Sequence, residues 1–173
     1  MASDCLNLSM IFDLAVKNSE KGVSYYRKMQ ELAEDTIAKE VFHRLAEEED
    51  EERRALIKVA RAEANEGEIN LDEQTYCYLC ALGDELSFPY DQTKEFRALT
   101  PRDALEIGIE AKKDGILLYH ELLNRCATKE AKNILLHLIE NEQRHLLELR
   151  DYMYELCPTG CKYYRKIGNT GVS

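Results

Sequence analysis

Apolar residues recur three and four positions apart over four long stretches of the chain. This spacing places apolar side chains on one face of an α-helix and polar side chains on the other. The pattern therefore predicts four helices, over residues 9–34, 36–65, 100–126 and 128–157. Residues 1–8 are expected to form a short leader.

Short sequence signals mark the ends of these helices. Ser9 and Thr36 are expected N-caps, because a hydroxyl oxygen can accept a hydrogen bond from an N–H group of the first turn. The run Thr100-Pro101-Arg102-Asp103 combines a cap, a proline at the first helical position and an acid in the first turn. Thr128 is the expected cap of the last helix, and Gly67 is expected to end the second.

A long connection, residues 67–99, separates the second helix from the third, and Gln74 to Leu82 could form a short helix within it. The other two connections are short. Two tight helical hairpins joined by one long crossover define the ferritin-like variant of the four-helix bundle. We therefore expect an all-α bundle of this kind over residues 1–157, followed by a C-terminal tail over residues 158–173.

The two hairpins are related by an internal repeat. A shift of 93 positions places the first hairpin on the second without a gap, as from Gly22 to Gly115. The matched positions pair Gly22 with Gly115, Tyr26 with Tyr119, Leu45 with Leu138, Glu49 with Glu142 and Leu56 with Leu149. Several of them fall on the predicted inner faces, so we interpret the chain as a duplication of one helical hairpin.

A Glu-x-x-His pair, Glu142 and His145, interrupts an otherwise apolar stripe of the last helix. The residues that share its helical face are Leu135, Leu138, Leu146 and Leu149. Leucine stripes face the core of a helical protein, so Glu142 and His145 should face it too. Because burying an unpaired carboxylate is costly, partners or a metal ion are expected there.

Polar residues of all four helices fall at the level of this pair. They are Ser19, Glu49, Glu52, Lys112, Glu142 and His145. Runs of acids such as residues 47–52 are usually solvated, but the repeat partner Glu142 favours an inward position for Glu49. Lys112 either joins the cluster or extends its ammonium group to solvent. Tyr26 and Tyr119 are expected to pack in the core and to hydrogen-bond a carboxylate.

The composition narrows the classes of partner. A formal net charge of −10 argues against nucleic acid, because phosphate binding needs a basic surface. No apolar run reaches the roughly 20 residues of a membrane span. The N-terminus lacks the basic-then-apolar pattern of a signal peptide. We therefore expect a cytoplasmic protein that binds neither nucleic acid nor membrane, with its six cysteines reduced.

Four of the cysteines offer an alternative site. Cys77-x-x-Cys80 and Cys157-x-x-x-Cys161 would together supply four thiolates for a metal ion or for thiol-dependent redox chemistry. Nothing in the sequence brings the two pairs together. Cys5 and Cys126 look incidental.

Residues 9–157 resemble the rubrerythrin-like branch of the ferritin-like family. The run Leu45-Ala46-Glu47-Glu48-Glu49 looks like that family's signature in the second helix, and Glu142-x-x-His145 matches its ligand pair in the last. The crossover residues Tyr78-Leu79-Cys80-Ala81-Leu82, followed by Phe88-Pro89, are similar too. The resemblance implies a di-iron site that takes one Glu from each of two helices and a Glu-x-x-His pair from each of the others.

The chain departs from this ligand pattern at three of the six positions. Ser19 and Lys112 stand where the first and third helices should each give a Glu, and Glu52 stands where the second should give a His. The candidate ligands for iron are therefore Glu49, Glu52, Glu142 and His145. Three carboxylates and one lysine sum to a charge of −2 with the histidine neutral, which one divalent cation would balance.

Three metal contents stay open at this point. The site could hold one ion, with Lys112 in one metal's place as a fixed cation paired to Glu142 or Glu49, or it could hold none. It could also hold two ions with unusual ligands, if a π-type distortion of the first helix turned Glu20 inward.

The resemblance implies oxidation by dioxygen or peroxide at the iron site, and it implies homodimers. Rubrerythrins often carry a rubredoxin-like module with two CxxC knuckles, and residues 157–173 are too few to form one. A redox role would therefore need a separate electron donor. The alternative is a metal-free bundle in which a network of Lys112 and the carboxylates supports a binding or structural role.

Overall fold

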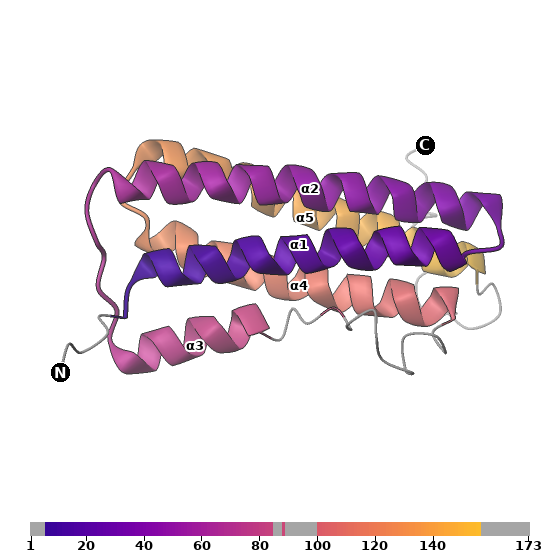
Figure 1. Cartoon of the computed structure of the whole chain (residues 1–173), viewed down its shortest axis with the longest axis horizontal. Coiled ribbons are helices and arrows are strands. Elements are labelled where there is room, and N and C mark those ends of the chain that lie inside the picture. The colour runs from indigo at the N-terminus through magenta and orange to yellow at the C-terminus, as the bar shows by residue number, and fades with distance from the viewer. Residues whose placement is uncertain (1–5, 85–87, 89–99, 157–173) are drawn as a thin grey trace, which may run out of the picture.

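A computed structural model describes residues 6–84, 88 and 100–156 of the chain. These residues form five α-helices: α1 (Leu8–Leu32), α2 (Thr36–Ala64), α3 (Glu73–Asp84), α4 (Pro101–Arg125) and α5 (Lys129–Leu156). The four long helices run side by side, and α3 lies along α1 and α4 (Figure 1). The described part contains no β-strand, only an isolated bridge between Asn7 and Asn70. The predicted all-α bundle of two hairpins is confirmed.

The first two helices begin at caps other than the predicted ones. The Asn7 side chain caps α1 by accepting a hydrogen bond, at 3.3 Å, from the amide three residues later. Asp35 caps α2 in the same way at 3.2 Å. Ser9 and Thr36 were therefore wrong as caps, because an amide or carboxylate oxygen just upstream already reaches the first free N–H group.

The other predicted boundaries are confirmed. Thr100 and Asp103 form a reciprocal capping box at the start of α4, with Pro101 at the first helical position. The Thr128 hydroxyl accepts a hydrogen bond of 3.1 Å from the first turn of α5. Gly67, just after α2, has a φ of 104°, a backbone conformation that favours glycine.

The apolar core is divided into two clusters that lie at different levels along the bundle. One includes Leu56, Leu118 and Leu135 and extends to α3. The other includes Tyr26 and Phe42, against which Phe88 packs from the crossover. Each long helix contributes polar residues between its parts of the two clusters, so a polar layer separates them.

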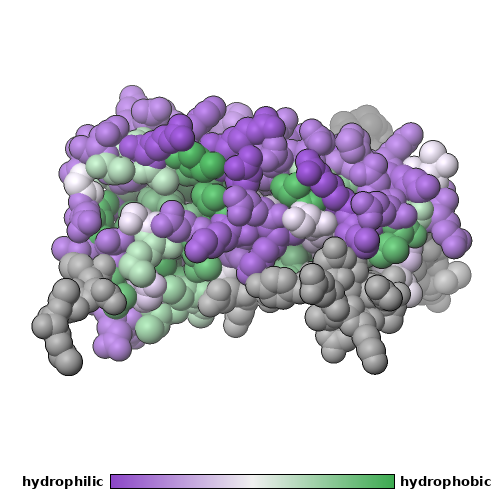
Figure 2. Space-filling view, viewed as in Figure 1, coloured by the Kyte–Doolittle hydropathy of each residue, from purple (hydrophilic) through white to green (hydrophobic). Residues whose placement is uncertain are grey.

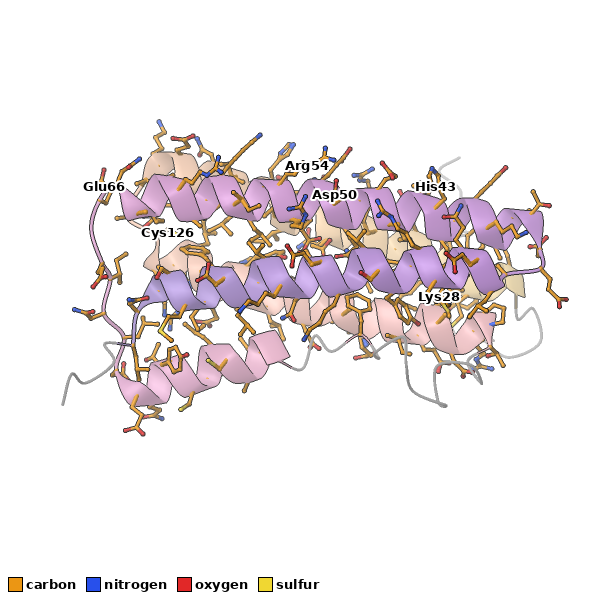
Figure 3. All side chains as sticks on the ribbon, viewed as in Figure 1. Lys28, His43, Asp50, Arg54, Glu66 and Cys126 are labelled. Carbon is orange, nitrogen blue, oxygen red and sulfur yellow. The ribbon has the colours of Figure 1, made fainter. Side chains whose placement is uncertain are left out.

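The face seen in Figure 2 is mostly polar. Hydrophilic side chains cover most of it, with apolar areas between them, and the broadest apolar area lies at the end where α3 is found. Side chains fill the space between the helices, whereas Arg54 and His43 project outward from α2 (Figure 3). Within the described residues, no helix is both long enough and apolar enough to cross a membrane.

A buried glutamate joins the two hairpins at one end of the bundle. Glu63, near the C-terminus of α2, is only 5% exposed. Its carboxylate accepts hydrogen bonds from the backbone N–H groups of Ala127 and Thr128, both at 2.8 Å, and from the Thr128 hydroxyl at 2.7 Å. The α4–α5 connection is therefore held in place from another helix.

We predict that Glu63→Ala lowers the free energy of unfolding by about 2–4 kcal/mol, because it leaves two backbone donors and one hydroxyl without their charged acceptor. Glu66→Ala is the matched control in the exposed turn after α2 and should change stability by less than about 0.5 kcal/mol. Urea denaturation followed by circular dichroism measures both. Equal effects of the two substitutions would contradict this role of Glu63.

Candidate functional site

The polar layer contains the residues that we predicted to lie at one level of the bundle. Glu49 and Glu52 come from α2, Lys112 from α4, and Glu142 and His145 from α5. All five are buried, with exposed fractions between 1% and 8%. Their predicted convergence is confirmed, because each lies on the inner face of its helix among apolar neighbours.

Lys112 lies at the centre of this cluster. Its Nζ atom is 2.8 Å from Glu49 Oε1, 2.8 Å from Glu142 Oε1 and 3.3 Å from Glu52 Oε2. An ammonium group has three N–H donors, and here each has a carboxylate acceptor. The lysine is 1% exposed, so the alternative in which its ammonium extends to solvent is wrong.

Two glycines leave room for two of these carboxylates. A Cβ atom on Gly22 would lie 2.7 Å from Glu49 Oε2, and one on Gly115 would lie 3.1 Å from Glu142 Oε2. Both glycines and both glutamates are pairs in the 93-residue repeat. Each of the duplicated hairpins therefore places a glycine of its first helix against a carboxylate of its second helix.

Ser19 is buried but takes no part in the network. Its hydroxyl donates to the Ala15 carbonyl of its own helix at 3.4 Å. A small cavity of about 20 Å³ borders Ser19, Lys112 and the three glutamates. Glu20 is exposed and α1 is α-helical throughout, so the inward turn of Glu20 that would rescue a two-metal site is wrong.

The two tyrosines behave differently although they are repeat partners. The Tyr119 hydroxyl donates to Glu52 Oε1. The Tyr26 hydroxyl is fully buried and makes no hydrogen bond, so the prediction of a carboxylate partner was wrong for this residue. His145 is the repeat partner of Glu52, but its imidazole faces Glu48 and Glu142 and gives the Tyr26 hydroxyl no acceptor. Burial raises the pKa of both phenols well above the usual value.

His145 lies between two carboxylates. Its Nδ1 atom is 3.4 Å from Glu142 Oε1, and its Nε2 atom is 3.4 Å from Glu48 Oε2. Burial lowers the pKa of the imidazole, which therefore stays neutral at pH 7, as expected. Sequence analysis missed Glu48. The signal was its position four residues before Glu52, which places both side chains on adjacent turns of one helical face.

Burial controls the charge of the cluster. It raises the pKa of Glu49 to about 8 and that of Glu142 well above the usual value, although Lys112 acts in the opposite direction. Burial also acts to raise the pKa of Glu52, but Lys112 and the Tyr119 hydroxyl outweigh it and the pKa is lowered. Glu52 is therefore the carboxylate that stays ionised at pH 7.

Lys112 carries the balancing charge. Burial acts to lower its pKa, but the three glutamates outweigh burial and the pKa lies well above the usual value. At pH 7 this ammonium faces the ionised Glu52 and two carboxyl groups, Glu49 and Glu142, whose raised pKa values favour their protonated forms. The predicted charge of −2 counts all three buried carboxylates as ionised, and the raised pKa values of Glu49 and Glu142 act against that count.

These contacts do not fit a two-metal centre. The ammonium group of Lys112 lies among the oxygens of Glu49, Glu52 and Glu142 that would have to bind the metals. In the part of the chain that the structure describes, no group of three or more His, Cys, Asp or Glu side chains is placed to hold a metal ion.

The cysteines of the alternative site are only partly placed. Cys77 is exposed and Cys80 is half-buried, both on α3. Cys157 and Cys161 lie outside the described residues, so the four-thiolate site stays a prediction, and Cys5 lies outside them too. Cys126 is buried at the C-terminus of α4, where burial raises the pKa of its thiol to about 12.

Comparison with known families agrees with this arrangement. The family model described as rubrerythrin matches residues 11–153, which include all four long helices almost entirely and every residue of the polar layer. No curated protein and no solved structure matches the chain.

We predict that Lys112→Met lowers the free energy of unfolding by about 3–5 kcal/mol at pH 8, because it leaves the buried carboxylates without their cation. Lys113→Met, which changes a partly exposed lysine on the same helix, should cost less than about 1 kcal/mol. Urea denaturation of the two variants and the parent measures this difference.

The loss should be smaller at pH 5 than at pH 8. Glu52 has a lowered pKa in the parent, so the stability from its pairing with Lys112 is the same at pH 8 and pH 5 and is lost only below the ordinary pKa of glutamate. Without Lys112, we expect burial to raise the pKa of all three carboxylates. The folded variant then becomes more stable as the pH falls and these groups are protonated. A loss that is independent of pH would contradict the described charge state.

Proposed function

Because the chain belongs to the rubrerythrin family, we propose that it is a member in which a lysine ammonium replaces the metal centre and the bundle works as a binding module. The observation that carries this proposal is the contact of Lys112 Nζ with Glu49, Glu52 and Glu142. A fixed internal cation performs the charge balance that a metal ion would otherwise perform.

The energetics of exchange support this proposal. A metal ion that binds the same oxygens must displace the ammonium of Lys112, which would then be buried without partners, a change that is strongly destabilising. It must also act against the raised pKa values of Glu49 and Glu142, which favour their protonated forms, because carboxylates bind metals in their ionised form. Both steps oppose metal binding.

A groove between α2 and α5 supports a binding role. It encloses about 650 Å³, within the range of small-molecule sites, and reaches inward to Glu52, Glu142 and His145. These residues of the polar layer thus form the inner wall of the groove. A ligand in this groove would meet a preformed surface that the lysine network holds in place.

A second candidate function is an iron-dependent oxidoreductase that acts on dioxygen or peroxide. The convergence of Glu49, Glu52, Glu142 and His145 favours it, since these are carboxylate and imidazole donors of the kind that ferritin-like proteins use. This function requires Lys112 to leave the centre and a separate electron donor. The family match is common to both candidates.

Metal content after anaerobic loading with ferrous iron distinguishes the two candidates. We expect the parent protein to retain substoichiometric iron after desalting, by elemental analysis per chain. Lys112→Glu should retain about one iron or more, because it removes the competing cation and adds a carboxylate. Lys113→Glu, the matched control, should behave as the parent. About one or two irons retained by the parent would overturn the proposed function and support the oxidoreductase.

A further inference from the structure

Cys77 and Cys80 form a pair of thiols on α3, outside the polar layer. They are three residues apart on the helix, so their side chains lie next to each other on its surface. Cys77 is exposed, Cys80 is half-buried, and both are free thiols. The helix α3 packs on α1 and α4, whereas the groove of the proposed binding module lies between α2 and α5. The pair is therefore a separate candidate site that a ligand can reach from outside the bundle.

The spacing of the two cysteines suits a shared metal ion better than a disulfide. Residues three apart on a helix have Cβ atoms about 5–6 Å apart, whereas a disulfide needs a Cβ separation of about 3.5–4.5 Å. Two sulfur atoms that bind one tetrahedral zinc ion at about 2.3 Å each lie about 3.8 Å from each other. Both side chains can therefore converge on one ion while α3 stays helical.

Two thiolates are only half of a zinc site. A structural zinc ion takes four ligands, and a tetrahedral set of four thiolates is typical of it. Among the described residues, no group of three or more His, Cys, Asp or Glu side chains is placed to hold a metal ion. A two-fold axis between two copies of the chain would double the pair of Cys77 and Cys80 to four thiolates.

The surface of α3 suits contact with a second copy. The chain as a whole is 32% charged, but the charged residues of α3 are Glu73 and Asp84, at its two ends. Between them, Tyr78 is 47% exposed beside Cys77. The broadest apolar area in Figure 2 lies at this end of the bundle, and exposed apolar areas often mark contact surfaces. Two copies with a net charge of −10 each repel one another least where the surface carries little charge.

We propose that two copies of the chain bind one zinc ion between them, with Cys77 and Cys80 of each copy as its four ligands and the two α3 helices in contact about a two-fold axis. The four thiols lose their protons to solvent as the ion binds. Pairing through α3 leaves the groove between α2 and α5 open, because α3 packs on the other two long helices. This inference goes beyond the proposed function and does not depend on it.

Size-exclusion chromatography with light scattering tests the proposal on the full chain, with a phosphine reductant present throughout. We expect added zinc ions to double the molar mass of the parent protein and EDTA to reverse the change. Elemental analysis of the zinc-bound species should give about one zinc per two chains, as four thiolates per ion require. The reductant prevents an intermolecular disulfide from causing the same change in mass.

Two double variants locate the site. Cys77→Ser with Cys80→Ser should lose both the zinc and the change in mass. Cys157→Ser with Cys161→Ser is the matched control, because it removes the same number of thiols outside α3, and it should behave as the parent. Urea denaturation followed by circular dichroism checks that both double variants are folded.

Several results would overturn the proposal. Zinc bound at about one ion per chain without a change in mass would indicate a site within one chain, and loss of zinc from the Cys157 and Cys161 variant would indicate that these thiols complete it. Absence of zinc binding to the parent, or zinc retained by the Cys77 and Cys80 variant, would also overturn it. None of these results bears on the proposed function, because iron retention at the centre is measured separately on protein without zinc.

Discussion

The ammonium group of Lys112 and its three carboxylate partners are the interaction on which the rest of the site depends. The group is almost fully buried, and each of its donors meets a glutamate from one of two other helices. Without this cation, α2 and α5 would bring carboxylates together in a low-dielectric interior, where like charges repel strongly. With it, the ion pair with Glu52 and the raised pKa values of Glu49 and Glu142 reduce the negative charge of the layer. The polar layer can then lie between two apolar clusters without an external ion.

The duplication of the hairpin explains both the symmetry of the centre and its asymmetry. Gly22 and Gly115 leave equivalent space beside Glu49 and Glu142. The symmetry breaks where the repeat pairs Glu52 with His145. Glu52 binds the Tyr119 hydroxyl and Lys112, whereas His145 faces Glu48 at the groove. The Tyr26 hydroxyl is left without a partner as a result. Glu52 therefore makes its contacts inside the bundle, whereas its repeat partner His145 lines the groove between α2 and α5.

Much of this organisation follows from the sequence alone. The four long helices, the short helix in the crossover and the convergence of the polar residues could be predicted, because apolar periodicity and the repeat are properties of whole helices. The caps at Asn7 and Asp35 could not, since several polar residues near each helix start compete for the same N–H groups. The raised pKa values of Glu49 and Glu142 and the contact of Glu48 with His145 depend on burial and on the distance between helices. Neither quantity is encoded in local spacing.

The most direct test of a lysine-filled centre is a crystal structure of the protein loaded anaerobically with ferrous iron, with diffraction data collected at the iron absorption edge. The account predicts Lys112 Nζ in hydrogen-bond contact with Glu49, Glu52 and Glu142, and no anomalous peak among these residues. An anomalous peak between Glu49 and Glu142, with the lysine side chain displaced, would contradict it.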